Sequence, residues 1–249
     1  MVKYISTILL LMGLLAQAQD FETLERDLKR QIHYTDTTYY SFDMKIVKDS
    51  PNRAVVVVAK FSTPYEEDGF DCKVTVYTVD ITTKKILGQY IFPKPFTSDS
   101  IKLSTFQLDF APYQLNAKTR AFGVRWSYNS SSRVSPFGES YIALFVLKNE
   151  QPTCILPQLQ TSESQGEWDM QCKYDKQEIN RLILVAPTQH NGYADLIVKS
   201  QTIIRSSRQP KVESDPCVEQ ELKSPYQKEI WMFKDGKYQK LVTKKSSRK

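Results

Sequence analysis

One stretch near the middle of the chain decides the fold class. It reads Arg120-Ala121-Phe122-Gly123-Val124-Arg125-Trp126-Ser127-Tyr128. Large apolar side chains occupy every second position from Phe122 to Tyr128, and small side chains and one guanidinium occupy the positions between them. Because alternate residues of a β-strand point to opposite faces, this period of two predicts a strand with one face in a core.

The same period recurs along most of the chain. Segments rich in Val, Ile, Tyr, Phe and Thr predict strands at 39–47, 53–61, 73–80, 85–92, 101–110, 120–128, 140–148, 153–158, 179–186, 193–205, 229–234 and 237–242. Many short strands separated by turn signals favour an antiparallel β-sandwich over a barrel. We therefore expect a mostly β protein with a β-sandwich-like domain.

The segment before the first strand has a different period. Phe21, Leu24, Leu28 and Ile32 recur at helical spacing, and Asp20 precedes them as a candidate N-cap. This pattern predicts a short amphipathic helix over about residues 21–32.

The extreme N-terminus has the pattern of a secretory signal peptide. Lys3 is followed by an almost wholly apolar segment, 4–15, and then by the cleavage pattern Ala16-Gln17-Ala18. We expect residues 1–18 to be removed in a bacterial cell, so that the mature chain begins at Gln19 and is periplasmic or secreted. The apolar segment is shorter than a membrane-spanning helix, so no membrane insertion of the mature chain is expected.

The positive charge is concentrated at the two ends. The formal net charge is +6, but Lys3 and the cations Lys244, Lys245, Arg248 and Lys249 account for most of it. Residues 19–243 are therefore close to neutral, which argues against a nucleic-acid partner. Residues 244–249 are predicted to be a disordered basic tail, and 19–243 a single β-rich domain, with 149–152 as an alternative point of division.

Few glycines and histidines are available for familiar enzyme motifs. The chain has eight Gly, none within a Gly-rich phosphate loop, and only two His, at 33 and 190. No metal and no cofactor are therefore predicted. The acidic run Glu66-Glu67-Asp68 with Asp71 is interpreted as a solvated turn in preference to a calcium site.

Four cysteines in an exported chain predict disulfide bonds. Three pairings are possible. A hairpin turn near 189–192 would place Cys172 and the chain leading to Cys217 at its two outer ends, which favours a Cys172–Cys217 bridge. Cys72 and Cys154 then form either a second bridge or two free thiols.

Arg125 is the first candidate binding residue. It shares a strand face with Ala121, Gly123 and Ser127, and a guanidinium on such a floor can hold a carboxylate or phosphate. Pairing of Arg125 with an acidic residue of the next strand is the favoured alternative. The candidate surface extends to Arg133, and to Trp168 and Asp169.

Glu167 and Asp169 form a second candidate site. In an extended segment the two carboxylates lie about 7 Å apart, within the range that inverting glycosidases use. Two surface acids flanking an inward Trp168 explain the same residues and are the favoured reading. These acids are the basis of the alternative hypothesis, a hydrolase acting on envelope glycan or ester.

Three stretches together resemble a family of exported bacterial β-rich proteins without an assigned activity. They are Ala111-Pro112-Tyr113 to Arg125, Ser132 to Phe137, and Gly166-Glu167-Trp168-Asp169 with Cys172. The resemblance covers roughly 101–217 and implies a shared fold and the Cys172–Cys217 bridge, but no catalytic residue.

The sequence therefore favours a non-catalytic binding or interaction module of the bacterial periplasm. Its expected partner is an envelope or periplasmic protein, and its oligomeric state is left open.

Overall fold

The computed structural model describes residues 22–35, 37–62, 69–210 and 215–241. The predicted signal peptide 1–18, the tail 244–249 and the acidic run 66–68 lie outside the described residues. Most of the described chain forms strands, and every strand pair in its two sheets is antiparallel. The prediction of a mostly β, sandwich-like fold is confirmed.

The smaller sheet comes from the N-terminal part of the chain. Its strand order is β1-β2-β3-β4, and β5 also pairs with β3. The bounds are Tyr39–Ile46 for β1, Arg53–Phe61 for β2, Phe70–Asp80 for β3, Ile86–Ile91 for β4 and Phe96–Ser98 for β5. A helix at residues 22–31 precedes it, and Leu24 and Leu28 of this helix are buried against one face of the sheet, as the helical spacing predicts.

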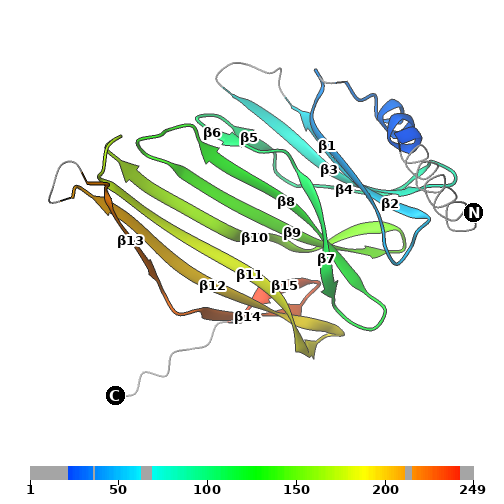
Figure 1. The fold of residues 1–249 in the computed structure, drawn as a ribbon. Coiled ribbons are helices and arrows are strands. Elements are labelled where there is room, and N and C mark those ends of the chain that lie inside the picture. The colour runs from blue at the N-terminus through cyan, green and yellow to red at the C-terminus, as the bar shows by residue number, and fades with distance from the viewer. Residues whose placement is uncertain (1–21, 36, 63–68, 211–214, 242–249) are drawn as a thin grey trace, which may run out of the picture.

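The larger sheet has the strand order β15-β14-β12-β11-β10-β9-β8-β6, with β13 pairing β12 and β7 pairing β8. The bounds are Ile101–Leu103 for β6, Gln107–Gln114 for β7, Arg120–Ser130 for β8, Phe137–Lys148 for β9, Gln151–Trp168 for β10, Tyr174–His190 for β11, Tyr193–Arg208 for β12, Val218–Lys223 for β13, Gln227–Lys234 for β14 and Lys237–Lys240 for β15. Figure 1 shows this sheet curling along its width, with the smaller sheet packed over the β8–β9 part.

The predicted strand at 101–110 is two strands in the structure. The chain leaves the ladder at 104–106, where Ser104 Oγ accepts a hydrogen bond from Ser127 N at 2.8 Å. The Ser41 hydroxyl of β1 accepts from Phe106 N at 3.3 Å. One backbone bond remains, from Ser104 N to Ser127 O at 2.8 Å, so side-chain hydroxyls replace only part of the ladder at this break.

β8 separates two hydrophobic cores. Phe122, Val124 and Trp126 lie in the core between the two sheets, as their alternation predicts. Ala121, on the opposite face of β8, belongs to a second core formed inside the curl of the larger sheet by residues of β9, β10, β12, β14 and β15. β8 therefore places the small side chain of Ala121 inside the curl of the larger sheet.

The β9–β10 turn is attached to the smaller sheet. The Arg53 guanidinium binds both carboxylate oxygens of Glu150, at 2.8 and 2.9 Å, and Asp80 at 2.7 Å. A bidentate pair of this kind fixes orientation as well as distance. Residues 149–150 are thus the turn of the β9–β10 hairpin, which Arg53 of β2 holds, and 151–152 already belong to β10.

The predicted disulfide is present. Cys172 and Cys217 are bonded and lie at the outer end of the β11–β12 hairpin. Cys72 and Cys154 are free thiols, and both are buried in the core between the sheets. Within the described residues, no helix has the length and apolarity needed to cross a membrane.

Candidate functional site

A polar groove of about 460 Å³ opens beside the break between β6 and β7. Its lining is dominated by hydroxyl groups and two guanidinium groups, and among the described residues no acidic side chain lines it. The lining residues are Ser104, Thr105, Gln107, Arg125, Trp126, Ser127, Ser140, Tyr141, Thr161, Ser162 and Arg181. The groove is therefore an array of hydrogen-bond donors with two positive charges.

Strand register brings three of the serines together. Ser127 of β8 pairs with Ser140 of β9, and Ser140 pairs with Ser162 of β10. A register shift between Gln160 and Ser162 sets this alignment. Since a bulge inserts one extra residue, Thr161 enters the groove beside Ser162 instead of alternating away from it.

Several polar side chains of the groove have no partner among the described residues. The Thr161 residue is 9% exposed, and its hydroxyl makes no hydrogen bond to any described residue. The same holds for the hydroxyls of Ser140 and Ser162. Nη1 of Arg181 is buried without a hydrogen-bond partner, and Nη2 of Arg181 lies 3.9 Å from Oε2 of Glu163. Because an unsatisfied buried polar group is costly, Nη1 of Arg181 is a donor that a ligand in the groove can satisfy, and the hydroxyls of Ser140, Thr161 and Ser162 line the same groove.

Arg125 both forms an ion pair and lines the groove, the two roles that the sequence analysis weighed for it. Its Nε donates to Oδ2 of Asp109 at 2.6 Å, so the expected ion pair with an acidic residue of the neighbouring strand is present. Part of the guanidinium also lines the groove. Burial alone would raise the pKa of Asp109, but hydrogen bonds from Ala111 N and Arg125 outweigh it and lower that pKa. Asp109 is therefore a fixed negative charge that holds Arg125 in place.

The position of Gly123 leaves no room for a side chain. A Cβ at this position would lie 2.6 Å from Cδ1 of Ile142 and 3.1 Å from Cβ of Asp109. The close approach that a strand glycine indicates is thus made by two side chains of neighbouring strands, one of which carries the carboxylate that binds Arg125.

Arg133, Trp168 and Asp169 are brought together at the far end of β10, apart from Arg125. The loop that carries Arg133 docks there, since Trp168 N donates to Val134 O at 2.8 Å. Ser162 and Trp168 are six positions apart on β10, about 20 Å of extended chain. The four residues that the sequence placed on one surface therefore lie on two. Of these four, Arg125 lines the groove, and Arg133, Trp168 and Asp169 lie at the end of β10.

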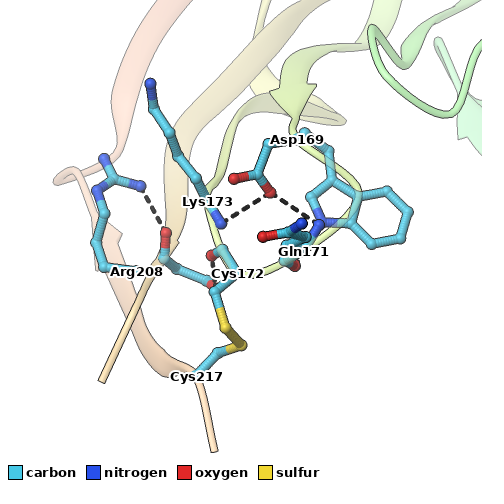
Figure 2. Close-up of a disulfide and its surroundings, with 8 residues drawn as sticks. Asp169, Gln171, Cys172, Lys173, Arg208 and Cys217 are labelled. Carbon is cyan, nitrogen blue, oxygen red and sulfur yellow. Dashed lines mark hydrogen bonds between the residues drawn. A yellow bond between two sulfur atoms is a disulfide. The ribbon is translucent and has the colours of Figure 1, made fainter. Parts of the chain in front are cut away.

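Asp169 organises the turn that precedes the disulfide. Its Oδ1 accepts from Gln171 N at 2.8 Å and from Lys173 N at 3.1 Å, next to the Cys172–Cys217 bond (Figure 2). The indole Nε1 of Trp168 donates to Gln171 O at 2.9 Å. Glu167 is exposed on the strand before this turn. Of the two acids proposed for hydrolysis, one carboxylate is thus engaged in turn formation.

His190 has a partner that the sequence analysis missed. Its Nδ1 lies 2.7 Å from Oδ1 of Asp195, which is only 2% exposed, and Thr188 donates to Oδ2 of Asp195 at 2.6 Å. These residues flank the β11–β12 turn, so the cluster ties the hairpin together. Among the described residues, no group of three or more His, Cys, Asp or Glu is placed to hold a metal ion.

Sequence reasoning did not find Arg181, Thr161 or Ser162. Serine and threonine are ordinary strand residues, and only the register and the bulge show that these side chains meet. No family model, curated protein or solved structure matches the chain. The resemblance to exported bacterial proteins therefore stays a prediction.

Proposed function

We propose that this protein is an exported, non-catalytic binding module that holds an anionic, oxygen-rich ligand in the groove between Arg125 and Arg181. The observation that carries the proposal is the buried, unpartnered Nη1 of Arg181, in a groove that the hydroxyls of Ser140, Thr161 and Ser162 also line. Guanidinium and hydroxyl donors match carboxylate, phosphate and sugar oxygens.

The charge of the groove supports an anion in preference to a neutral ligand. Its lining holds two Arg and no Asp or Glu. Asp109 and Glu163 bind these arginines from outside the lining, at 2.6 and 3.9 Å, and orient the guanidinium groups without occupying the groove. A ligand carboxylate or phosphate would supply the missing acceptor.

Export to the periplasm or to the outside of the cell is part of the proposal. The Cys172–Cys217 disulfide supports it, because such bonds persist in oxidising compartments. The signal-peptide pattern at 1–18 supports it as well. Expression in a bacterial host followed by N-terminal sequencing tests it, with Gln19 as the expected first residue and a retained leader as the contrary result.

The binding test uses three probes that separate charge from sugar shape. Inorganic phosphate, a trimer of galacturonic acid and the neutral trisaccharide maltotriose are titrated by calorimetry into the purified protein. We expect saturable binding of at least one anionic probe and none of maltotriose. Absence of binding of either anion at millimolar concentration would contradict the proposal.

Two groove variants and one matched control locate the binding. Arg181→Gln and Thr161→Val remove donors from the groove, and Arg181→Gln is expected to weaken anion binding by at least tenfold, since a hydrogen bond to a charged group contributes about 1.5–3 kcal/mol. Arg133→Gln removes an exposed arginine outside the groove and should leave binding unchanged. Equal losses in Arg133→Gln and Arg181→Gln would show unspecific charge attraction instead.

A further inference from the structure

We infer that the free edge of β13 (Val218–Lys223) docks an extended peptide strand of a partner protein in which basic and apolar residues alternate. β13 lies at the margin of the larger sheet (Figure 1). It pairs with β12 on one side, and within the described residues no strand pairs with its other side. This surface is separate from the groove and does not depend on it.

The outer backbone groups of β13 are available for a further strand. Ser224 N donates to Thr202 O at 2.9 Å, which sets the direction of the amides at this end of the strand. Since amide directions alternate along a strand, the N–H groups of Glu219, Glu221 and Lys223 point away from β12. An unpaired row of this kind is the template on which a partner strand adds by main-chain hydrogen bonds.

One face of the edge exposes three apolar side chains among polar ones. Val218 is 50% exposed and Leu222 65% exposed, and both lie on this face. Ile204 of β12 lies directly across from Leu222 and is also exposed. Apolar side chains at alternate positions of an added strand would cover these three residues, so the proposed partner has an apolar residue at every second position.

The opposite face of the edge carries two acids, Glu219 and Glu221, beside two cations, Arg205 of β12 and Lys223. Glu219, Ser207 of β12 and Tyr174 of β11 lie in one register row. They border a concavity of about 420 Å³ that also includes Glu221. Glu221 is already held by Arg205 at 2.8 Å and Lys223 at 2.7 Å, but the carboxylate of Glu219 has no ion pair or hydrogen bond among the described residues. A Lys or Arg of the partner strand would pair with Glu219.

The disulfide holds this edge in place without a core beneath it. All six residues of β13 are exposed, so burial alone does little to fix the strand. Cys217 directly precedes Val218 and is bonded to Cys172, whose carbonyl accepts a hydrogen bond from Ser207. A strand that is ordered before binding loses less entropy when a partner adds to it.

The experiment uses synthetic peptides and the whole protein. An eight-residue peptide of alternating Val and Lys is titrated by NMR, with a Val/Glu peptide and a Val/Lys peptide of scrambled order as controls. We expect saturable binding of the alternating Val/Lys peptide alone. We also expect slower hydrogen exchange of the Glu219, Glu221 and Lys223 amides in the complex.

Charge reversal makes the test specific. Glu219→Lys should weaken binding of the Val/Lys peptide at least tenfold and should allow the Val/Glu peptide to bind. Glu22→Lys, at an exposed acid of the helix, is the matched control and should bind like the unchanged protein. Thermal denaturation verifies that each variant is folded.

Three results would overturn the inference. One is the absence of saturable binding, and another is equal weakening by Glu219→Lys and Glu22→Lys. The third is a concentration-dependent dimer in sedimentation experiments that is abolished by Leu222→Lys, which would assign the edge to a second copy of the chain.

Discussion

The guanidinium of Arg125 and the carboxylate of Asp109 join β8 to β7 through a bond of 2.6 Å between Nε and Oδ2. Asp109 has two further donors, Ala111 N at 2.8 Å and the Tyr113 hydroxyl at 3.0 Å. The carboxylate is mostly buried, whereas Arg125 is partly exposed to the groove. Asp109 is therefore the structural member of the pair, and Arg125 is the member that a ligand can reach.

This asymmetry predicts unequal costs of substitution. Asp109→Ala removes one acceptor from three donors and should lower the free energy of unfolding by about 2–4 kcal/mol, since breaking a buried pair leaves its partners uncompensated. Arg125→Ala should cost about 1 kcal/mol, because its charge is partly solvated. Urea denaturation of the two variants measures both values. Equal costs would contradict the assigned roles.

The same carboxylate predicts a pH dependence. The pKa of Asp109 is lowered in the folded protein, because hydrogen bonds from Ala111 N and Arg125 outweigh the effect of burial. Its contribution to stability is thus fully present above the unfolded-state pKa of about 3.9 and is lost as the pH falls through the folded-state pKa. The stability difference between the unchanged protein and Asp109→Asn should narrow as the pH falls from 6 toward 3. Urea denaturation midpoints of the two proteins across this pH range test the prediction. A stability difference that stays constant with pH would contradict it.

The disulfide closes a long loop. Cys172 and Cys217 are 45 residues apart, and the chain-entropy relation gives about 4 kcal/mol for a loop of this length. The double variant Cys172→Ser/Cys217→Ser should lose a comparable amount and should show faster hydrogen exchange at β13, whose start the bond holds. Cys72→Ser is the matched control at a thiol outside the bridge, where a loss of β13 protection would be unexpected.

The strands could be predicted because their signal is local. From Phe122 to Tyr128 the alternation alone predicts which side chains enter the core between the sheets, and the structure confirms it. β13 was missed because its two apolar residues, Val218 and Leu222, are separated by three polar residues, which is too weak an alternation to mark a strand.

The groove could not be predicted, because it depends on how strands align. Ser127, Ser140 and Ser162 are far apart in sequence and meet only through the register of three strands. The bulge that brings Thr161 beside Ser162 has no marker in the sequence letters. Arg125 could be identified as a candidate binding residue because it is the one charged residue on a strand face of small side chains. Arg181 could not, because it lies in a strand of mixed composition.

The two free thiols should be unreactive in the folded protein. Burial raises the pKa of Cys72 to about 12 and that of Cys154 to about 11. Because the thiolate is the reacting form, neither residue should be labelled by iodoacetamide at pH 8 over an hour, and both should be labelled after unfolding in guanidinium. Mass spectrometry of tryptic peptides distinguishes the sites. Rapid labelling of Cys154 in the native protein would contradict this expectation. It would show that β10 opens locally and exposes the core between the two sheets.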